Sequence, residues 1–209
     1  MILRSIFVLA IGYLVGSLNT SIIVGRFYGM DIREHGSSNA GMTNTFRVLG
    51  NVAGILVILG DTFKGVLSGY IGKCILGNLA LVPEIGVLLG GLGAILGHNF
   101  PVFFGFKGGK GILTTATVLM YIDFKIAASL FIVFLVIVVC TRYISLGSIV
   151  CAVLMPVAVL IFRQDVARMY MFVWSVLVAV SAVVMHRGNI ERLLHGKESK
   201  FSIKRKCKT

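Results

Sequence analysis

Charged side chains are scarce in this sequence. They make up 13% of its 209 residues, against 57% for hydrophobic residues, whereas an ordinary soluble domain is about a quarter charged. A soluble chain of this size could not bury so much apolar surface. The composition therefore excludes a soluble domain and predicts an all-α integral membrane protein, because a stretch of about 20 mostly apolar residues forms a helix that crosses a bilayer.

Signatures of several other protein classes are missing as well. The four cysteines have neither paired nor metal-type spacing, so we expect no disulfide and no zinc site. The acidic residues do not cluster as a divalent-cation site requires, and we expect no metal, no cofactor and no obligate protein partner. A formal net charge of +12 does not indicate nucleic acid, since no RNA- or DNA-binding motif accompanies it and basic residues collect on the cytoplasmic side of membrane proteins.

Charged residues divide the chain into seven apolar segments, which we expect to be membrane spans. The second contains Asp61 and Lys64 and the fourth is short, so five spans is the alternative count. The first lacks the small-residue cleavage site of a removed signal peptide. The expected spans cover residues 5–25, 48–72, 85–106, 111–122, 126–141, 143–162 and 169–185.

The basic residues indicate how this single domain, residues 1–209, is oriented in the membrane. With a cytoplasmic C-terminus, 14 of the 20 lysines and arginines lie inside and 5 outside, with Lys64 within the second span. The positive-inside rule favours this orientation. The first, third and seventh spans then end on the cytoplasmic face, where polar loops form the expected site, and a basic tail begins at about residue 196.

The first of three polar clusters is DIREHGSSNAGMTNTFRVLG, residues 31–50. Its serines, asparagines and glycines predict a loop, and Thr43 or Asn44 is expected to cap the following helix. A helix N-terminus offers free N–H groups to a phosphate, and Arg47 supplies a guanidinium that binds phosphate or carboxylate in a bidentate manner. The alternative is a polar loop between helices with an ordinary cap, which the small polar residues alone would favour.

The second polar cluster is GHNFPVFFGFKGGKG, residues 97–111. It is not a nucleotide-binding P-loop, because Phe104 stands in place of the first glycine of that motif and Gly111 in place of its Ser or Thr. The glycines nevertheless allow close backbone approach, and Lys107 and Lys110 can neutralise a phosphate. The alternative is a pair of lysines that extend to the membrane interface, which does not explain the Gly-Gly pair between them.

The third polar cluster is HRGNIERLLHGKE, residues 186–198. His186 and Asn189 share one face of a helix, and we expect them to bind a phosphate as hydrogen-bond donors. The alternative is a basic amphipathic helix on anionic lipid, which is our interpretation of the tail KESKFSIKRKCKT. Asp61 and Lys64 are charges inside a span and hence functional candidates, unless they simply pair at a helix end.

The three segments HGSSNAGMTNTFR, GHNFPVFFGFKGGKG and HRGNIERLLHGKE resemble, in order and spacing, the signature motifs of the bacterial acyl-phosphate:glycerol-3-phosphate acyltransferases. The resemblance covers essentially the whole chain. It implies a seven-helix protein of the bacterial inner membrane with its site at the cytoplasmic face. It also implies transfer of a fatty acyl group from acyl phosphate to glycerol 3-phosphate, which gives lysophosphatidate and inorganic phosphate in the first step of phospholipid synthesis. The family usually has Gly and Ala where this chain has Ser38 and Met42.

The same resemblance assigns roles to individual residues. The family's motif serine and arginine match Ser37 and Arg47, its glycine-rich loop matches Lys107–Gly111, and its histidine and asparagine match His186 and Asn189. The catalytic candidates are Ser37, Arg47, Lys107, His186 and Asn189, and the substrate-binding candidates are Ser38, Asn39, Thr43, Asn44, Lys64, His98, Gly108, Gly109, Lys110 and Gly111.

Several alternatives remain open from the residues. The chain lacks the His-x-x-x-x-Asp dyad of the soluble glycerolipid acyltransferases, which disfavours a coenzyme A-dependent mechanism of that type. The proton acceptor is either His186 or a substrate phosphate, and we expect the phosphate. An organic-phosphate transporter and a lipid-binding membrane scaffold are the alternative functions.

Overall fold

The computed structural model describes residues 1–77 and 82–201 of the chain. In these residues the chain forms ten α-helices, two short 3₁₀ turns and no β-strand. Six segments are long and apolar enough to cross a membrane, and the shorter apolar helix Ile112–Ile122 provides a seventh. The predicted all-α integral membrane fold with about seven spans is confirmed, and the alternative count of five is wrong.

Most helices correspond to one span each. The spans are α1 (Ile2–Gly16) together with α2 (Thr20–Phe27), then α4 (Asn51–Leu76), α5 (Ile85–Asn99), α6 (Ile112–Ile122), α7 (Phe124–Thr141), α8 (Ile144–Phe162) and α9 (Arg168–Met185). The remaining elements connect or follow the spans; they are η1 (Ile32–Glu34), α3 (Met42–Leu49), η2 (Val102–Phe104) and α10 (Arg187–Leu194).

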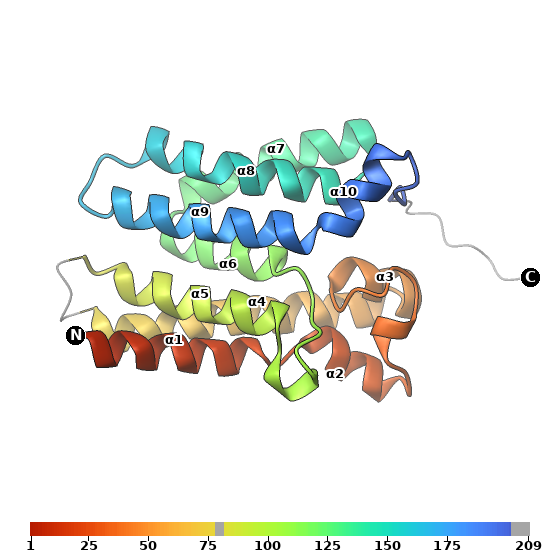
Figure 1. Cartoon of the computed structure of the whole chain (residues 1–209), viewed down its shortest axis with the longest axis horizontal. Helices are drawn as coiled ribbons and strands as arrows, with labels where there is room; N and C mark the ends of the chain where they lie inside the picture. Colours follow the sequence, from red (N-terminus) through yellow and green to blue (C-terminus); the bar gives the residue numbers. More distant parts are fainter. Residues whose placement is uncertain (78–81, 202–209) are drawn as a thin grey trace, which may run out of the picture.

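The spans form two layers (Figure 1). Helices α1, α4 and α5 pack in one layer and α7, α8 and α9 in the other, with α6 between them. Helices α3 and α10 lie at one end of the bundle, and the N-terminus and the connection between α8 and α9 lie at the opposite end. The three polar clusters therefore meet at the same end of the molecule.

Helix α5 is held tightly between α1 and α4 by facing glycines. A Cβ atom added to Gly12 would lie 2.3 Å from the carbonyl oxygen of Gly90. A Cβ atom added to Gly72 would lie 1.9 Å from the carbonyl oxygen of Gly86. Small residues allow backbones to approach this closely in membranes. The glycines thus fix the position of α5, whose C-terminal end carries His98 and leads into the second polar cluster.

Polar residues affect the first two spans in different ways. The first span is not one helix: Asn19 interrupts it, and its side chain accepts from the N–H of Ile22 at 3.1 Å to cap α2. Conversely, Asp61 and Lys64 do not interrupt the second span, since α4 continues unbroken through both. The two charges pair at 2.8 Å inside the bundle, well away from either helix end.

The predicted caps in the first cluster are wrong. Helix α3 has Gly41 as its N-cap, and Thr43 and Asn44 lie in its first turn. The Asn44 side chain instead bonds to the preceding loop. Gly50, with a φ of 86°, then separates α3 from α4, so the second span begins at Asn51 rather than at residue 48.

The tail is not the predicted amphipathic helix in its first part. Residues 197–201 have irregular structure. The rest of the predicted basic tail, residues 202–209, lies outside the described residues.

Candidate active site

A cavity of about 730 Å³ lies where the three polar clusters meet. One part of its wall is polar and comes mainly from those clusters, and the other part is apolar and comes from α6, α7 and α8. The apolar part includes Leu113, Ala116, Leu119, Ala127, Leu130, Phe134, Ala152 and Met155. A single space therefore joins a polar end to an apolar end inside the bundle.

The loop of the first cluster is shaped by the buried side chain of Asn44. Its Nδ2 donates to the carbonyls of Ile32 at 3.1 Å and His35 at 2.9 Å, and its Oδ1 accepts from the N–H of Ser37 at 2.8 Å. These three hydrogen bonds fold the loop back onto α3. They present the first turn of α3 and Arg47 to the cavity.

Ser38 stands on the cavity wall in a strained conformation. Its φ is 56°, in the left-handed region where a side chain crowds the backbone. The sequence resemblance places a glycine at this position, and the structure explains that preference.

Gly108 and Gly109 of the second cluster pack directly on the end of α5. Their N–H groups donate to the carbonyls of Asn99 at 3.2 Å and His98 at 3.0 Å. A Cβ atom on Gly108 would lie 2.1 Å from the carbonyl oxygen of His98, and one on Gly109 would lie 2.2 Å from its Nε2. Larger residues do not fit at either position, which accounts for the Gly-Gly pair between the two lysines.

The two lysines of this loop differ in position. Lys110 lines the cavity, and its Nζ donates to Oδ1 of Asn189. Lys107 is exposed beside the cavity rather than on its wall, and its carbonyl accepts from Nη1 of Arg33 at 3.1 Å. Burial lowers the pKa of Lys110 to about 8, although the carboxylate of Glu198 opposes the shift.

Glu198 organises the third cluster. Its Oε1 accepts from Nδ2 of Asn189 at 2.6 Å and from Oγ of Ser145 at 2.7 Å, and its Oε2 accepts from Nε of Arg192 at 2.8 Å. Burial raises the pKa of Glu198, but these hydrogen bonds outweigh it and hold the pKa below its usual value. Glu198 thus orients Asn189, which in turn meets Lys110.

His186 is buried at the junction of α9 and α10. Its Nδ1 lies 2.7 Å from the carbonyl oxygen of Ala182, and Nδ1 must carry the hydrogen because a carbonyl only accepts. Burial, assisted by the charge of Lys110, lowers the pKa of His186 to about 4. The imidazole is therefore neutral at pH 7, and its Nε2 offers an acceptor where we had expected a phosphate donor.

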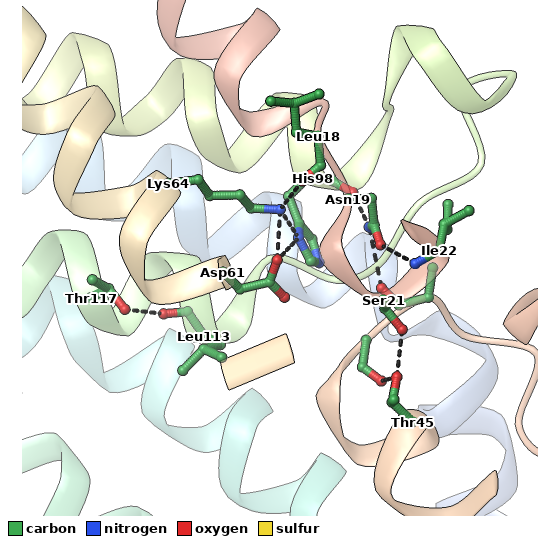
Figure 2. Close-up of polar contacts among 12 residues, drawn as sticks. Leu18, Asn19, Ser21, Ile22, Thr45, Asp61, Lys64, His98, Leu113 and Thr117 are labelled. Carbon is green, nitrogen blue, oxygen red and sulfur yellow. Dashed lines mark hydrogen bonds and ion pairs between the residues drawn. The ribbon is translucent and has the colours of Figure 1, made fainter. Parts of the chain in front are cut away.

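Asp61, Lys64 and His98 form a buried ionic group at the polar wall, and Figure 2 shows their contacts. The Nζ of Lys64 is 2.8 Å from Oδ1 of Asp61 and 2.8 Å from Nδ1 of His98. Asp61 and His98 reach the cavity, whereas Lys64 lies behind them. Lys64 was expected to bind substrate, but in the structure it contacts Asp61 and His98 of the wall instead.

Most of the predicted site residues meet at the cavity. Those on its wall are Ser37, Ser38, Asn39, Thr43, Asn44, Arg47, His98, Lys110, Gly111, His186 and Asn189; those beside or behind it are Lys64, Lys107, Gly108 and Gly109.

The predicted catalytic and substrate-binding sets leave out several polar wall residues, namely Asp61, Thr115, Ser145, Ser148, Arg192, Glu198 and Ser199. Asp61 carried a sequence signal as a charge within a span, and Glu198 as a lone acid in a basic segment. Ser145 carried none, because a serine near a helix start is common.

The chain matches a family of known proteins along nearly its whole length. The profile of the family described as Glycerol-3-phosphate acyltransferase matches residues 6–196. The chain is 41% identical to the glycerol-3-phosphate acyltransferase of Shouchella clausii, over 98% of this chain and 99% of the relative. It is 38% identical to that of Chlorobaculum tepidum, over 95% and 97% of the two chains.

This chain belongs to the glycerol-3-phosphate acyltransferase family. Its fold is similar to the crystal structure of PlsY (YgiH), an integral membrane glycerol 3-phosphate acyltransferase, in the glycerol 3-phosphate form. The TM-score is 0.83 at 34% identity, and the match covers 95% of this chain and 96% of that one. The predicted membrane acyltransferase of phospholipid synthesis is confirmed against the transporter and scaffold alternatives.

Proposed function

We propose that this member of the glycerol-3-phosphate acyltransferase family takes its acyl group from acyl phosphate and transfers it to glycerol 3-phosphate at the cytoplasmic face of the bacterial cell membrane. The products are lysophosphatidate and inorganic phosphate. One observation carries the proposal: a single cavity has a cationic polar end and an apolar end between membrane helices. Such a cavity suits two phosphate-bearing substrates, one of which also has a long acyl chain.

The polar end supplies the phosphate contacts. Arg47 and Lys110 bring positive charge to the wall, and the first turn of α3 directs backbone N–H groups at the same space. Arg192 lies there as well, but its guanidinium group already forms an ion pair with Glu198. Arg47 and Lys110 therefore hold the phosphates in this proposal, and Lys107 adds positive charge from outside the wall.

In the reaction, the glycerol hydroxyl oxygen attacks the acyl carbonyl carbon. A new C–O bond forms, the bond between the carbonyl carbon and the phosphate oxygen breaks, and the hydroxyl proton passes to a phosphate. Donors that face the carbonyl oxygen stabilise its transient negative charge, a contribution of about 3–4 kcal/mol per donor in acyl-transfer enzymes where it has been measured. The Ser37–Asn39 loop and Lys110 are placed to provide such donors.

In this mechanism His186 orients glycerol 3-phosphate, which accepts the acyl group. Its neutral Nε2 accepts a hydrogen bond from the glycerol hydroxyl. With a pKa of about 4 it is a weaker base than a phosphate monoester, whose second pKa is about 6. The proton therefore passes to a substrate phosphate.

Assays of purified protein with each acyl donor test the proposal. Glycerol 3-phosphate is supplied with either acyl phosphate or acyl-coenzyme A, and inorganic phosphate and lysophosphatidate are measured. We expect equal amounts of both products from acyl phosphate and no turnover with the thioester. Arg47→Gln should abolish most of the activity, and Arg4→Gln, at the opposite end of the bundle, serves as the matched control. Turnover with acyl-coenzyme A alone would overturn the proposal.

A further inference from the structure

Asp61, Lys64 and His98 form a buried group that takes no part in the reaction steps described above (Figure 2). Their exposed fractions are 1%, 4% and 4%. Charges inside a membrane span are costly and are retained where they serve a site. Since Lys64 is off the cavity wall, direct substrate binding does not account for it.

The contacts of Lys64 determine where the hydrogen atoms lie. Its Nζ has three acceptors around it: Oδ1 of Asp61 at 2.8 Å, Nδ1 of His98 at 2.8 Å and the carbonyl oxygen of Leu18 at 3.4 Å. An ammonium group has three N–H donors and no acceptor. Nζ hydrogen-bonds to Nδ1 of His98 and to the carbonyl of Leu18 and forms an ion pair with Asp61. Because an ammonium group cannot accept, Nδ1 of His98 must accept.

An alternative assignment, with a neutral lysine and a charged histidine, fits the distances less well. Nδ1 of His98 lies 3.6 Å from Oδ1 of Asp61, beyond hydrogen-bonding distance, whereas Nζ of Lys64 lies 2.8 Å from the same oxygen. The proton is thus on the lysine. The Asp61–Lys64 pair has no net charge, and the imidazole beside it is neutral.

A neutral imidazole that accepts at Nδ1 carries its hydrogen on Nε2. This edge of the ring faces Gly109, where an added Cβ would lie 2.2 Å from Nε2, and His98 lines the cavity. The main chain also fixes the residue, because its carbonyl accepts from the N–H of Gly109 at 3.0 Å. Among the described residues, no protein acceptor is recorded for Nε2.

We propose that Asp61 and Lys64 lock His98 in its Nε2–H tautomer and so make it a permanent, neutral hydrogen-bond donor to an anionic oxygen of the substrate. Asp61 and Lys64 are positioning residues, and His98 is the residue that touches substrate. The anionic oxygen belongs either to a bound phosphate or to the tetrahedral intermediate. The substrate contact rests on the proposed function, whereas the tautomer does not.

The tautomer is measured directly by NMR of protein labelled with ¹⁵N in its histidine rings. The spectrum of His98→Gln identifies the His98 signals among those of the four histidines. In the unaltered protein at pH 7 we expect one His98 form, protonated at Nε2 and unprotonated at Nδ1. An Nδ1–H form or an imidazolium as the main species would overturn the proposal whatever the acyl donor is.

The double variant Asp61→Asn/Lys64→Met removes both charges together and avoids leaving one of them buried alone. We expect it to fold and to show both tautomers of His98. Only molecules with the Nε2–H tautomer can donate to the substrate. The ratio of kcat/KM in this variant to that of the unaltered protein should therefore equal the Nε2–H fraction measured by NMR. A purely structural role would not link these two quantities, and a single Nε2–H form in this variant would show that no lock exists.

Variants of His98 test the donor itself, in assays with whichever acyl donor supports turnover. His98→Leu should lose about 10- to 100-fold in kcat/KM, as expected for a hydrogen bond to a charged group. His98→Gln, whose amide can donate near the same place, should keep more activity than His98→Leu. A rise in KM for glycerol 3-phosphate would assign the donor to a phosphate, and a fall in kcat to the intermediate. Unchanged kcat/KM in a folded His98→Leu protein would overturn the proposal.

Discussion

At the scale of single residues, Ser38 has a backbone conformation that most side chains avoid. Ser38→Gly should raise the free energy of unfolding by about 0.5–1 kcal/mol, because relief of the left-handed strain exceeds the extra backbone entropy of glycine. Ser38→Ala, which keeps the strain, is the matched control. Denaturation in detergent measures both variants. A Ser38→Gly protein less stable than Ser38→Ala would contradict this explanation.

Lys110 and Lys107 look equivalent in the sequence but differ in the structure. Lys110→Gln should raise the KM for a phosphate-bearing substrate by about 10- to 100-fold, while kcat falls less, as expected for lost ground-state binding. We expect a smaller increase for Lys107→Gln, because that lysine lies off the cavity wall. An unchanged KM with a much lower kcat would assign either lysine to the transition state.

The pKa of Lys110 adds a pH dependence to this prediction. A lysine is charged below its pKa, so binding of an anionic substrate should weaken as the pH rises through about 8. Lys110→Gln should abolish this alkaline change in KM, and Lys107→Gln should keep it. Kinetic profiles between pH 6 and pH 9 measure the effect.

His186 should orient the acceptor without being the base. His186→Asn should leave measurable kcat and should keep the loss of rate below about pH 6, because that loss belongs to protonation of a substrate phosphate. The pKa of His186 itself is lowered to about 4, well below this pH. His195→Asn, at an exposed histidine after α10, is the control. A fall of about 10²–10⁴-fold in kcat, together with loss of the limb near pH 6, would make His186 the base.

At the scale of helices, glycines determine how closely the spans pack. A Cβ atom on Gly90 would lie 2.2 Å from the carbonyl oxygen of Ser68, whereas on Gly65 it would meet its neighbours at an ordinary 3.4 Å. Gly90→Ala should therefore destabilise the protein by about 1–3 kcal/mol, as overpacking does, and Gly65→Ala should be nearly neutral. Thermal unfolding in detergent compares the two. Equal melting temperatures would mean that the close approach of α4 and α5 is not required.

The sequence predicts the spans well because hydrophobicity reports directly on burial in lipid. It predicts helix ends less well, since an end depends on what a polar side chain contacts. Asn44 was expected to cap α3, but its side chain bonds to the loop carbonyls instead. The second span was expected to carry Asp61 and Lys64, with pairing at a helix end as the alternative, but the two charges pair in the middle of α4, where they do not need to reach water.

The same limit applies to the site. Each of the three polar clusters is a continuous stretch of sequence whose residue types are those that bind phosphate. The sequence alone therefore predicts them. Glu198 and Ser145 come together only in the folded bundle, across 53 positions of sequence. Local patterns carry no information about such a pair.

At the scale of the whole molecule, the orientation in the membrane is a prediction from charge. Single cysteines at Ser38, Lys107 and Lys197, in a protein without its own cysteines, should react with an impermeant thiol reagent only in inverted vesicles. Gln164→Cys, on the connection between α8 and α9, should react only in intact cells. The opposite pattern would place the site outside the cytoplasm.

The polar end of the cavity draws on residues from Gly36 to Glu198. Each span after the first therefore separates, or contributes to, parts of one site. A nascent chain that has inserted six spans holds Arg47 and Lys110 in the membrane but has neither His186 nor the carboxylate that orients Asn189. If these residues act as proposed, we expect activity to appear only when all seven spans have been inserted, so that activity reports assembly of the whole bundle.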